Sequence, residues 1–137
     1  MFHTSVIHNL SAFLPIYFGG SAIILFNAGR IFKKKYLKRI SYRLYMLTSL
    51  VTTFTCGFGG ASIRAAESAP GVNSFIVKTH AWSAMLVFLL SAFMFYYSFK
   101  SIRNTEDTTK YDNRLNILSV AFLMIFTFTT IWAFKIR

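Results

Sequence analysis

The sequence is short of acidic residues, cysteine and proline. It has only 4 Asp and Glu residues, 1 Cys and 2 Pro among its 137 residues. A single cysteine, Cys56, forms no disulfide within the chain and no thiolate metal cluster, so we interpret it as a small apolar packing residue. The sequence also lacks an acid–base pair, a nucleophile constellation and a phosphate-binding loop, which argues against a catalytic enzyme.

Charge is absent from four long stretches of the chain. Residues 1–29, 44–63, 79–99 and 115–134 contain no Lys, Arg, Asp or Glu. The whole chain is 55% hydrophobic and 18% aromatic, which is too apolar for an ordinary soluble domain of this size. Each stretch is long enough to cross about 30 Å of hydrocarbon as an α-helix of about 20 residues. We therefore predict an all-α fold, with one domain over residues 1–137 and four transmembrane helices.

The apolar stretches also place the helices along the chain. The predicted helices cover about residues 4–32, 42–66, 75–100 and 113–133. The first begins too near residue 1, without a basic leader or an Ala-x-Ala site, for a typical secretory signal, so we expect it to be retained. Pro15 should bend this helix, because proline removes a backbone donor and clashes with the preceding turn. Short connections make successive helices antiparallel, which predicts an up-down-up-down bundle.

Basic residues are distributed unevenly over the predicted connections. Of 15 Lys and Arg residues, 11 fall between helices one and two or between helices three and four, and 4 fall on the opposite side. The positive-inside rule then predicts a multi-pass protein of the bacterial inner membrane, with both termini on the outer, periplasmic side. The net charge of +11 is therefore interpreted as the signal that orients the chain in the membrane. It is not interpreted as a nucleic-acid-binding surface. The cluster from Lys33 to Arg39 either serves topology alone or also contacts anionic lipid headgroups.

A short motif occurs twice in the sequence. His-x-x-Ser-Ala-x-Leu begins at His8 and again at His80, an offset of 72 positions. A second similarity relates the segments that begin at Arg43 and Arg114, at an offset of 71. Internal repeats of this kind often reflect repeated architecture. The two offsets predict two helical hairpins, related by a pseudo-twofold axis along the membrane normal.

The repeated histidines are predicted to lie at the same depth in the membrane. His8 is 22 residues from Arg30 and His80 is 20 residues from Lys100. These separations correspond to about 33 and 30 Å of helix. Ionisable side chains in membrane helices usually face the bundle interior, and two level imidazoles on facing helices suit axial ligation of a haem iron. His3 is the alternative ligand. In the opposing interpretation, His8 is hydrated at the interface and His80 donates to a backbone carbonyl.

Small and basic residues occur near the predicted depth of the histidines. The outer half of helix two contains Gly57, Gly59 and Gly60, a density of glycine that costs helix stability. We predict that a neighbouring backbone or a flat cofactor approaches closely there, and plain helix–helix packing is the alternative. Arg64 and Lys78 lie at the same face and are the candidates to pair with haem propionates.

The segment His3-Thr4-Ser5-Val6-Ile7-His8 resembles the start of a family of small bacterial four-span membrane domains of unknown function. The first helix of that family begins His-Pro-x-x-Val-His-Phe-Pro, and another histidine stands at the start of its third helix, as His80 does here. In this chain Thr4 replaces the first proline and Asn9-Leu10 replaces Phe-Pro. The resemblance implies a four-helix membrane domain that works with respiratory or cytochrome systems.

Three functions fit these patterns. The first is a small membrane subunit that binds a b-type haem near the outer face. It would take part in electron transfer between quinol and a periplasmic cytochrome within a larger respiratory-type complex. The second is a cofactor-free structural or accessory subunit that packs against other membrane subunits and lipids. The third is a metal or proton site built from His3, His8, His80 and Glu67. A visible absorption spectrum separates the first function from the second.

The distribution of basic residues predicts the orientation of the chain in the membrane. In a Cys56→Ser background, the Lys35→Cys variant should not react with a membrane-impermeant thiol reagent in outer-permeabilised cells, because residue 35 faces the cytoplasm. The Asn73→Cys variant, in the predicted outer loop, should react under the same conditions and serves as the control. Labelling at residue 35 without labelling at residue 73 would reverse the orientation.

Overall fold

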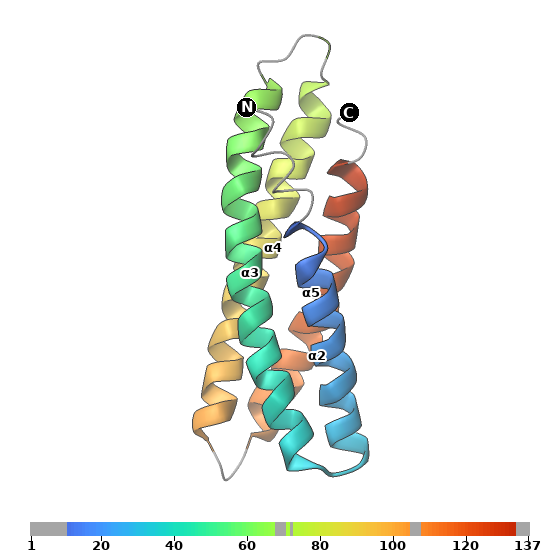
Figure 1. Ribbon diagram of the computed structural model, residues 1–137, viewed down its shortest axis with the longest axis vertical. Coiled ribbons are helices and arrows are strands. Elements are labelled where there is room, and N and C mark those ends of the chain that lie inside the picture. The colour runs from blue at the N-terminus through green and yellow to red at the C-terminus, as the bar shows by residue number, and fades with distance from the viewer. Residues whose placement is uncertain (1–10, 68–70, 72, 105–107, 134–137) are drawn as a thin grey trace.

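The computed structural model describes residues 11–67, 71, 73–104 and 108–133, with the backbone alone for residues 61–67 and 132–133. Within these ranges the structure is almost entirely helical and contains no strand. It has four long helices, α2 (Leu14–Ile31), α3 (Lys35–Glu67), α4 (Ser74–Arg103) and α5 (Thr109–Ala133). Each helix runs antiparallel to the next, along a common axis (Figure 1). The prediction of an all-α chain with four helices is confirmed.

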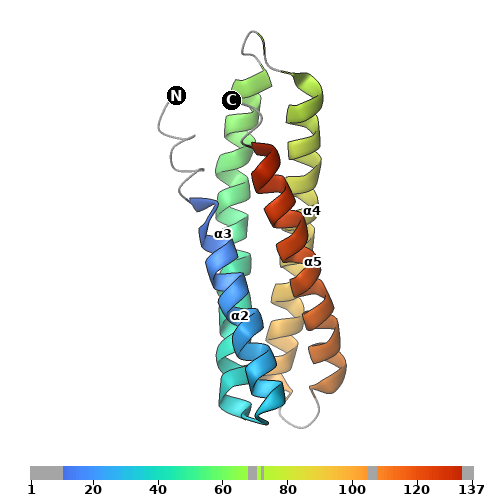
Figure 2. The same cartoon turned by 90° about the vertical axis from the view of Figure 1, so that its right-hand side faces the viewer.

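The four helices are packed as two antiparallel hairpins. α3 packs against α2 and α4, and α5 packs against α4 and, over a smaller surface, α2. The α2–α3 pair and the α4–α5 pair are seen side by side when the molecule is turned (Figure 2). The last turns of α2 and α4 and the first turns of α3 and α5 lie together at one end of the bundle (Figure 1). We call this the basic end, because it carries Arg30, Lys35, Lys38, Lys100, Arg103, Lys110 and Arg114.

Two predicted features of the helices differ from the structure. α3 begins at Lys35 rather than at residue 42, so most of the predicted basic loop is helical. Lys, Arg and Leu are good helix formers, and exposed charge at the end of the bundle does not prevent a helix from forming. Pro15 lies in the first turn of α2, where a missing N–H costs little, and the predicted continuous helix is interrupted just before it, between the helical residue Ser11 and Leu14. Residues 12 and 13 form a turn before it. The predicted helical residues 4–10 lie outside the described residues.

Each helix buries a stripe of residues with a coiled-coil spacing. The stripe of α2 consists of Pro15, Gly19, Ala22, Phe26 and Gly29. The stripe of α4 consists of Val77, His80, Val87, Ser91, Met94, Ser98 and Ser101. Alternating steps of three and four residues average 3.5, the period at which helices pack along a left-handed supercoil. The five buried residues of α4 from Val87 onward follow the five of α2 by 72 positions, the offset of the histidine motif.

The interior of the bundle is polar and its exterior is apolar. Among the described side chains, twelve buried ones are polar or charged and ten are hydrophobic, so polar groups form half of the core. Large apolar side chains face outward instead, and Ile24 and Ile117 are each 70% exposed. A soluble bundle has the opposite distribution. Hydrocarbon surroundings favour this one, because small and polar residues then pack between helices.

Three of the four helices, α2, α4 and α5, are long and apolar enough to cross a membrane. α3 is longer but less apolar, since its buried stripe is rich in hydroxyl residues. Most of these hydroxyls donate to the carbonyl one turn earlier, as Thr48 does to Leu44 at 2.7 Å and Thr52 does to Thr48 at 2.8 Å. Such bonds satisfy a buried hydroxyl without a partner on another helix.

The turn from α2 into α3 is short and closely packed. The Lys34 N–H donates to the Gly29 carbonyl at 3.0 Å and the Lys33 N–H donates to the Arg30 carbonyl at 3.4 Å, the two bonds of a Schellman motif. Lys33 has φ of +54°, in the left-handed region that favours glycine. Gly29 lets α3 approach, since a Cβ there would lie 2.9 Å from the backbone nitrogen of Lys38.

The backbone of Lys33 generates a stability prediction. Lys33→Gly should raise the free energy of unfolding by about 1 kcal/mol, because a side chain in the left-handed region costs about 1–2 kcal/mol and glycine avoids that cost. Lys34→Gly removes the same charge one residue later, where φ is not positive, and should not stabilise the chain. Thermal unfolding in detergent micelles compares the two variants. Equal effects of both would show that charge, and not backbone strain, sets the change.

Candidate functional site

A polar cluster joins α3 to α5 at the basic end. Asp112, in the first turn of α5, is only 4% exposed. Its carboxylate accepts hydrogen bonds from the Tyr42 hydroxyl at 2.5 Å and from the Thr108 hydroxyl at 3.0 Å. It also forms an ion pair with Lys38. The helix dipole favours a negative charge in this first turn. These four residues, the Asp112 cluster, give both carboxylate oxygens a partner.

The Asp112 cluster fixes α3 against α5. A buried charge is tolerated when it is paired and hydrogen-bonded, and removal of one partner leaves the remaining charge poorly compensated. The Lys38 side chain is 23% exposed and that of Asp112 is 6% exposed, so the ammonium group reaches solvent while the carboxylate does not. The sequence patterns gave Asp112 no role. The signal that could have found it is an acidic residue in the first turn of a predicted helix, where the helix dipole favours a negative charge.

His80 lies in the half of α4 that is remote from the basic end. Its ring is buried, at 6% exposure, and faces α5. Nδ1 is 3.1 Å from the Thr129 carbonyl oxygen. Because a carbonyl only accepts, Nδ1 carries the proton in this contact and Nε2 is the basic nitrogen. The His80 ring therefore faces the bundle interior, as predicted for a ligand. It also donates to a backbone carbonyl, as predicted in the opposing interpretation.

The other candidate ligands are placed only in part. His3 and His8 lie outside the described residues, as do the side chains of Arg64 and Glu67. Lys78 is exposed, two residues before His80 in α4. Across the described part of the chain, no three His, Cys, Asp or Glu side chains are grouped closely enough to hold a metal ion.

The glycines of α3 do not all face the same way. Gly59 is buried, whereas Gly57 and Gly60 are exposed. A Cβ added at Gly57 or at Gly60 would meet no described atom within 4 Å. The inward stripe of α3 runs through Thr52, Thr55 and Gly59, and helical rotation of about 100° per residue turns the other two glycines outward. Among the described residues, no neighbour approaches Gly57 or Gly60 closely, and Gly59 is the one of the three that faces the interior.

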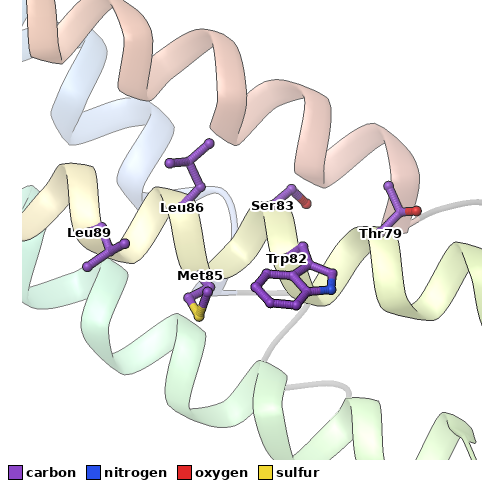
Figure 3. Close-up of a pocket in the computed structure, with 6 residues that line it drawn as sticks. All are labelled: Thr79, Trp82, Ser83, Met85, Leu86 and Leu89. Atoms are coloured by element: carbon purple, nitrogen blue, oxygen red, sulfur yellow. The ribbon is translucent and has the colours of Figure 1, made fainter.

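A shallow apolar groove of about 520 Å³ follows the outer surface of α4 (Figure 3). Its described lining consists of Thr79, Trp82, Ser83, Met85, Leu86 and Leu89, all from α4. Trp82 is 68% exposed, whereas His80 is buried. Two residues apart on a helix correspond to about 200° of rotation, so the groove and the His80 ring lie on opposite sides of α4. The groove suits apolar chains and is separate from the histidine.

Comparisons of this chain with protein-family models, with curated proteins and with solved structures find no match. The class of protein is therefore defined by the geometry alone. It is an all-α protein of four antiparallel helices, three of them long and apolar enough to cross a membrane, with a polar interior.

The Asp112 cluster generates a second stability prediction. Tyr42→Phe should lower the free energy of unfolding by about 2 kcal/mol, because a hydrogen bond to a charged group contributes about 1.5–3 kcal/mol. Tyr36→Phe removes the same hydroxyl from a side chain that is 60% exposed and should change stability little. Denaturation of both variants in the same detergent gives the difference. Equal stability of the two would show that the carboxylate does not depend on Tyr42.

Proposed function

We propose that all four helices span the bacterial inner membrane and that the protein is a haem-binding subunit of a larger membrane complex. The membrane assignment is supported by the apolar exterior and by the three helices of sufficient length and hydropathy. α3 packs along α2 and along α4, so it occupies the same slab as its neighbours. Its residues 44–63 carry no charge, which suits the hydrocarbon layer.

The basic end is assigned to the cytoplasm. Basic side chains there lie over tyrosine rings, with Lys100 5.7 Å from the ring centre of Tyr96 and Arg114 5.7 Å from that of Tyr97. Long basic side chains and aromatic rings of this kind favour a membrane–water interface. The positive charge of these side chains favours the cytoplasmic side of the membrane. Both termini are then periplasmic.

The geometry of His80 is the observation that carries the haem proposal. Histidines that bind metal usually donate the other ring nitrogen to a carbonyl or carboxylate, which fixes the tautomer and the orientation of the ring. The contact from Nδ1 of His80 to the Thr129 carbonyl has this form. Val77, fully buried one turn earlier, keeps the surroundings apolar. These features fit an axial ligand to a haem near the outer face.

His8 is the proposed second axial ligand. The offset of 72 positions that relates the buried stripes of α2 and α4 also relates His8 to His80. This coincidence supports an inward position for His8, and His3 is the alternative. Buried Gly59 is the one of the three glycines that suits a close contact, and Arg64 and Lys78 remain the proposed partners of the propionates.

Such a haem would supply a one-electron redox centre. The chain itself contributes the orientation of His80 through Thr129 and an apolar layer that excludes water from the ring. We assign it to electron transfer between quinol and a periplasmic cytochrome or partner subunit. The resemblance of residues 3–8 to four-span bacterial membrane domains supports the same context.

A cofactor-free subunit is the second candidate, and two observations favour it. The contact between His80 and Thr129 already joins α4 to α5, which is a structural role in itself. Gly57 and Gly60 present small residues outward, where a helix of another membrane subunit can pack closely. In this interpretation the chain stabilises a larger complex and carries no electrons.

The two candidates predict different spectra for the purified protein. If haem is bound, the protein from haem-replete cells should show a low-spin b-type spectrum that His8→Ala and His80→Ala each abolish, because each removes an axial ligand. His3→Ala should keep the spectrum and at most shift the reduction potential. Circular dichroism of every variant checks that the helices remain. A wild-type protein without a haem spectrum, or a spectrum that survives His80→Ala, rejects the haem proposal and leaves the structural subunit.

A further inference from the structure

Three buried oxygen atoms near the Asp112 cluster make no hydrogen bond to any residue that the structure describes. They are Ser98 Oγ and Ser101 Oγ on α4 and Asn116 Oδ1 on α5. Ser98 is fully buried and Ser101 is 3% exposed. Ser91, on the same stripe of α4, behaves differently, because its hydroxyl donates to the Phe88 carbonyl at 2.8 Å. The two unpaired serine hydroxyls thus lie on the part of the α4 stripe nearest the basic end.

The two serine hydroxyls lie level with the Asp112 cluster. The register of α4 against α5 is set by Tyr97, whose hydroxyl is 3.1 Å from Arg114 Nη1 and whose ring centre is 6.3 Å from that of Tyr111. Ser98, the next residue of α4, is therefore close to the level of Asp112. Asn116 lies one helical turn further from the basic end than Asp112, on the same side of α5 as Leu123, which faces Gly19 of α2. Its oxygen is therefore separate from the two serine hydroxyls.

The α3 side of this region is also polar. The Tyr42 hydroxyl, which donates to Asp112, lies near the Ser101 and Thr108 hydroxyls. The two unpaired serine hydroxyls of α4 thus lie beside the Asp112 cluster of α3 and α5. Buried polar groups are almost always hydrogen-bonded, and one left unpaired costs more than an ordinary hydrogen bond contributes. The two serine hydroxyls therefore indicate a small polar ligand.

The chemistry of these groups selects the ligand. The Asp112 carboxylate only accepts hydrogen bonds, whereas the serine hydroxyls both donate and accept. A second cation would be repelled by Lys38, which already neutralises Asp112. Water donates two hydrogen bonds and accepts two, so it satisfies all of these groups without adding charge.

We propose that the junction of α3, α4 and α5 at the basic end is a buried water-binding site, bounded by Ser98, Ser101 and the Asp112 cluster. Lys38, partly exposed, connects it to solvent at that end. Met94 and Phe122, both fully buried, close it from above. It does not depend on a haem.

Serine-to-alanine variants test the site. With water bound, Ser98→Ala and Ser101→Ala each remove a hydrogen bond and should lower the unfolding temperature by a few degrees, as Ser91→Ala does. Ser91 is the matched control, since it is buried on the same stripe and has its own partner. Without bound water, each variant removes an unpaired buried hydroxyl, so the unfolding temperature should stay the same or rise. An unchanged or raised unfolding temperature for both would overturn the proposal.

Hydroxyl-radical footprinting by X-ray radiolysis gives a second readout on the wild-type protein. Radicals formed from bound water label adjacent side chains, so Tyr42 should be oxidised far faster than its 3% exposure predicts. Phe122, fully buried in the apolar layer, should stay unlabelled. A Ser98→Leu/Ser101→Leu variant that keeps its helices should reduce labelling of Tyr42 several-fold. Labelling of Tyr42 no faster than that of Phe122 would overturn the site.

Discussion

The structure depends on one constraint, which is that polar groups turned away from an apolar surface must find partners inside the bundle. Hydroxyls of α3 meet this requirement through their own backbone, one turn earlier, as Thr48 and Thr52 do. Others bridge helices, as the Ser49 hydroxyl does to the Ser91 carbonyl at 2.7 Å. Since both kinds of bond are internal, large side chains are left for the exterior. The small polar residues of the buried stripes also let neighbouring helices approach closely along their length.

The two ends of the bundle carry different chemistry. At the basic end, charge, close backbone contact at Gly29 and the buried carboxylate of Asp112 hold the helices in register. In the remote half, a single imidazole contact joins α4 to α5, and no ion pair occurs among the described residues there. Between them lie Ala22 and Phe122, both fully buried. The described contacts that join the helices are thus ionic at one end of the bundle and uncharged at the other.

The sequence predicted the number and order of the helices because charge-free runs are a direct signal of apolar helices. It did not predict the start of α3 at Lys35, since basic residues form helix as readily as they form a loop. The three glycines of α3 were predicted as a group from their density, whereas rotation of the helix buries Gly59 and turns Gly57 and Gly60 outward. Asp112 was missed because its role arises from Tyr42 and Lys38, some seventy positions away. The inward position of His80 could be predicted because an ionisable residue in an apolar run usually faces the bundle interior.

The stripe of α2 differs from the others in having no side chain that bonds to another helix. Pro15, Gly19, Ala22, Phe26 and Gly29 contribute shape alone, and the described side-chain hydrogen bonds of α2 stay within it, as for Asn27 to the Ile23 carbonyl at 2.9 Å. The polar bridges between described helices all connect α3, α4 and α5. α2 is consequently held against the bundle by shape rather than by side-chain hydrogen bonds, through its close packing on α3 and the backbone contact at Gly29. A larger side chain anywhere along this stripe would therefore push α2 away from α3, with no polar bridge to oppose the displacement.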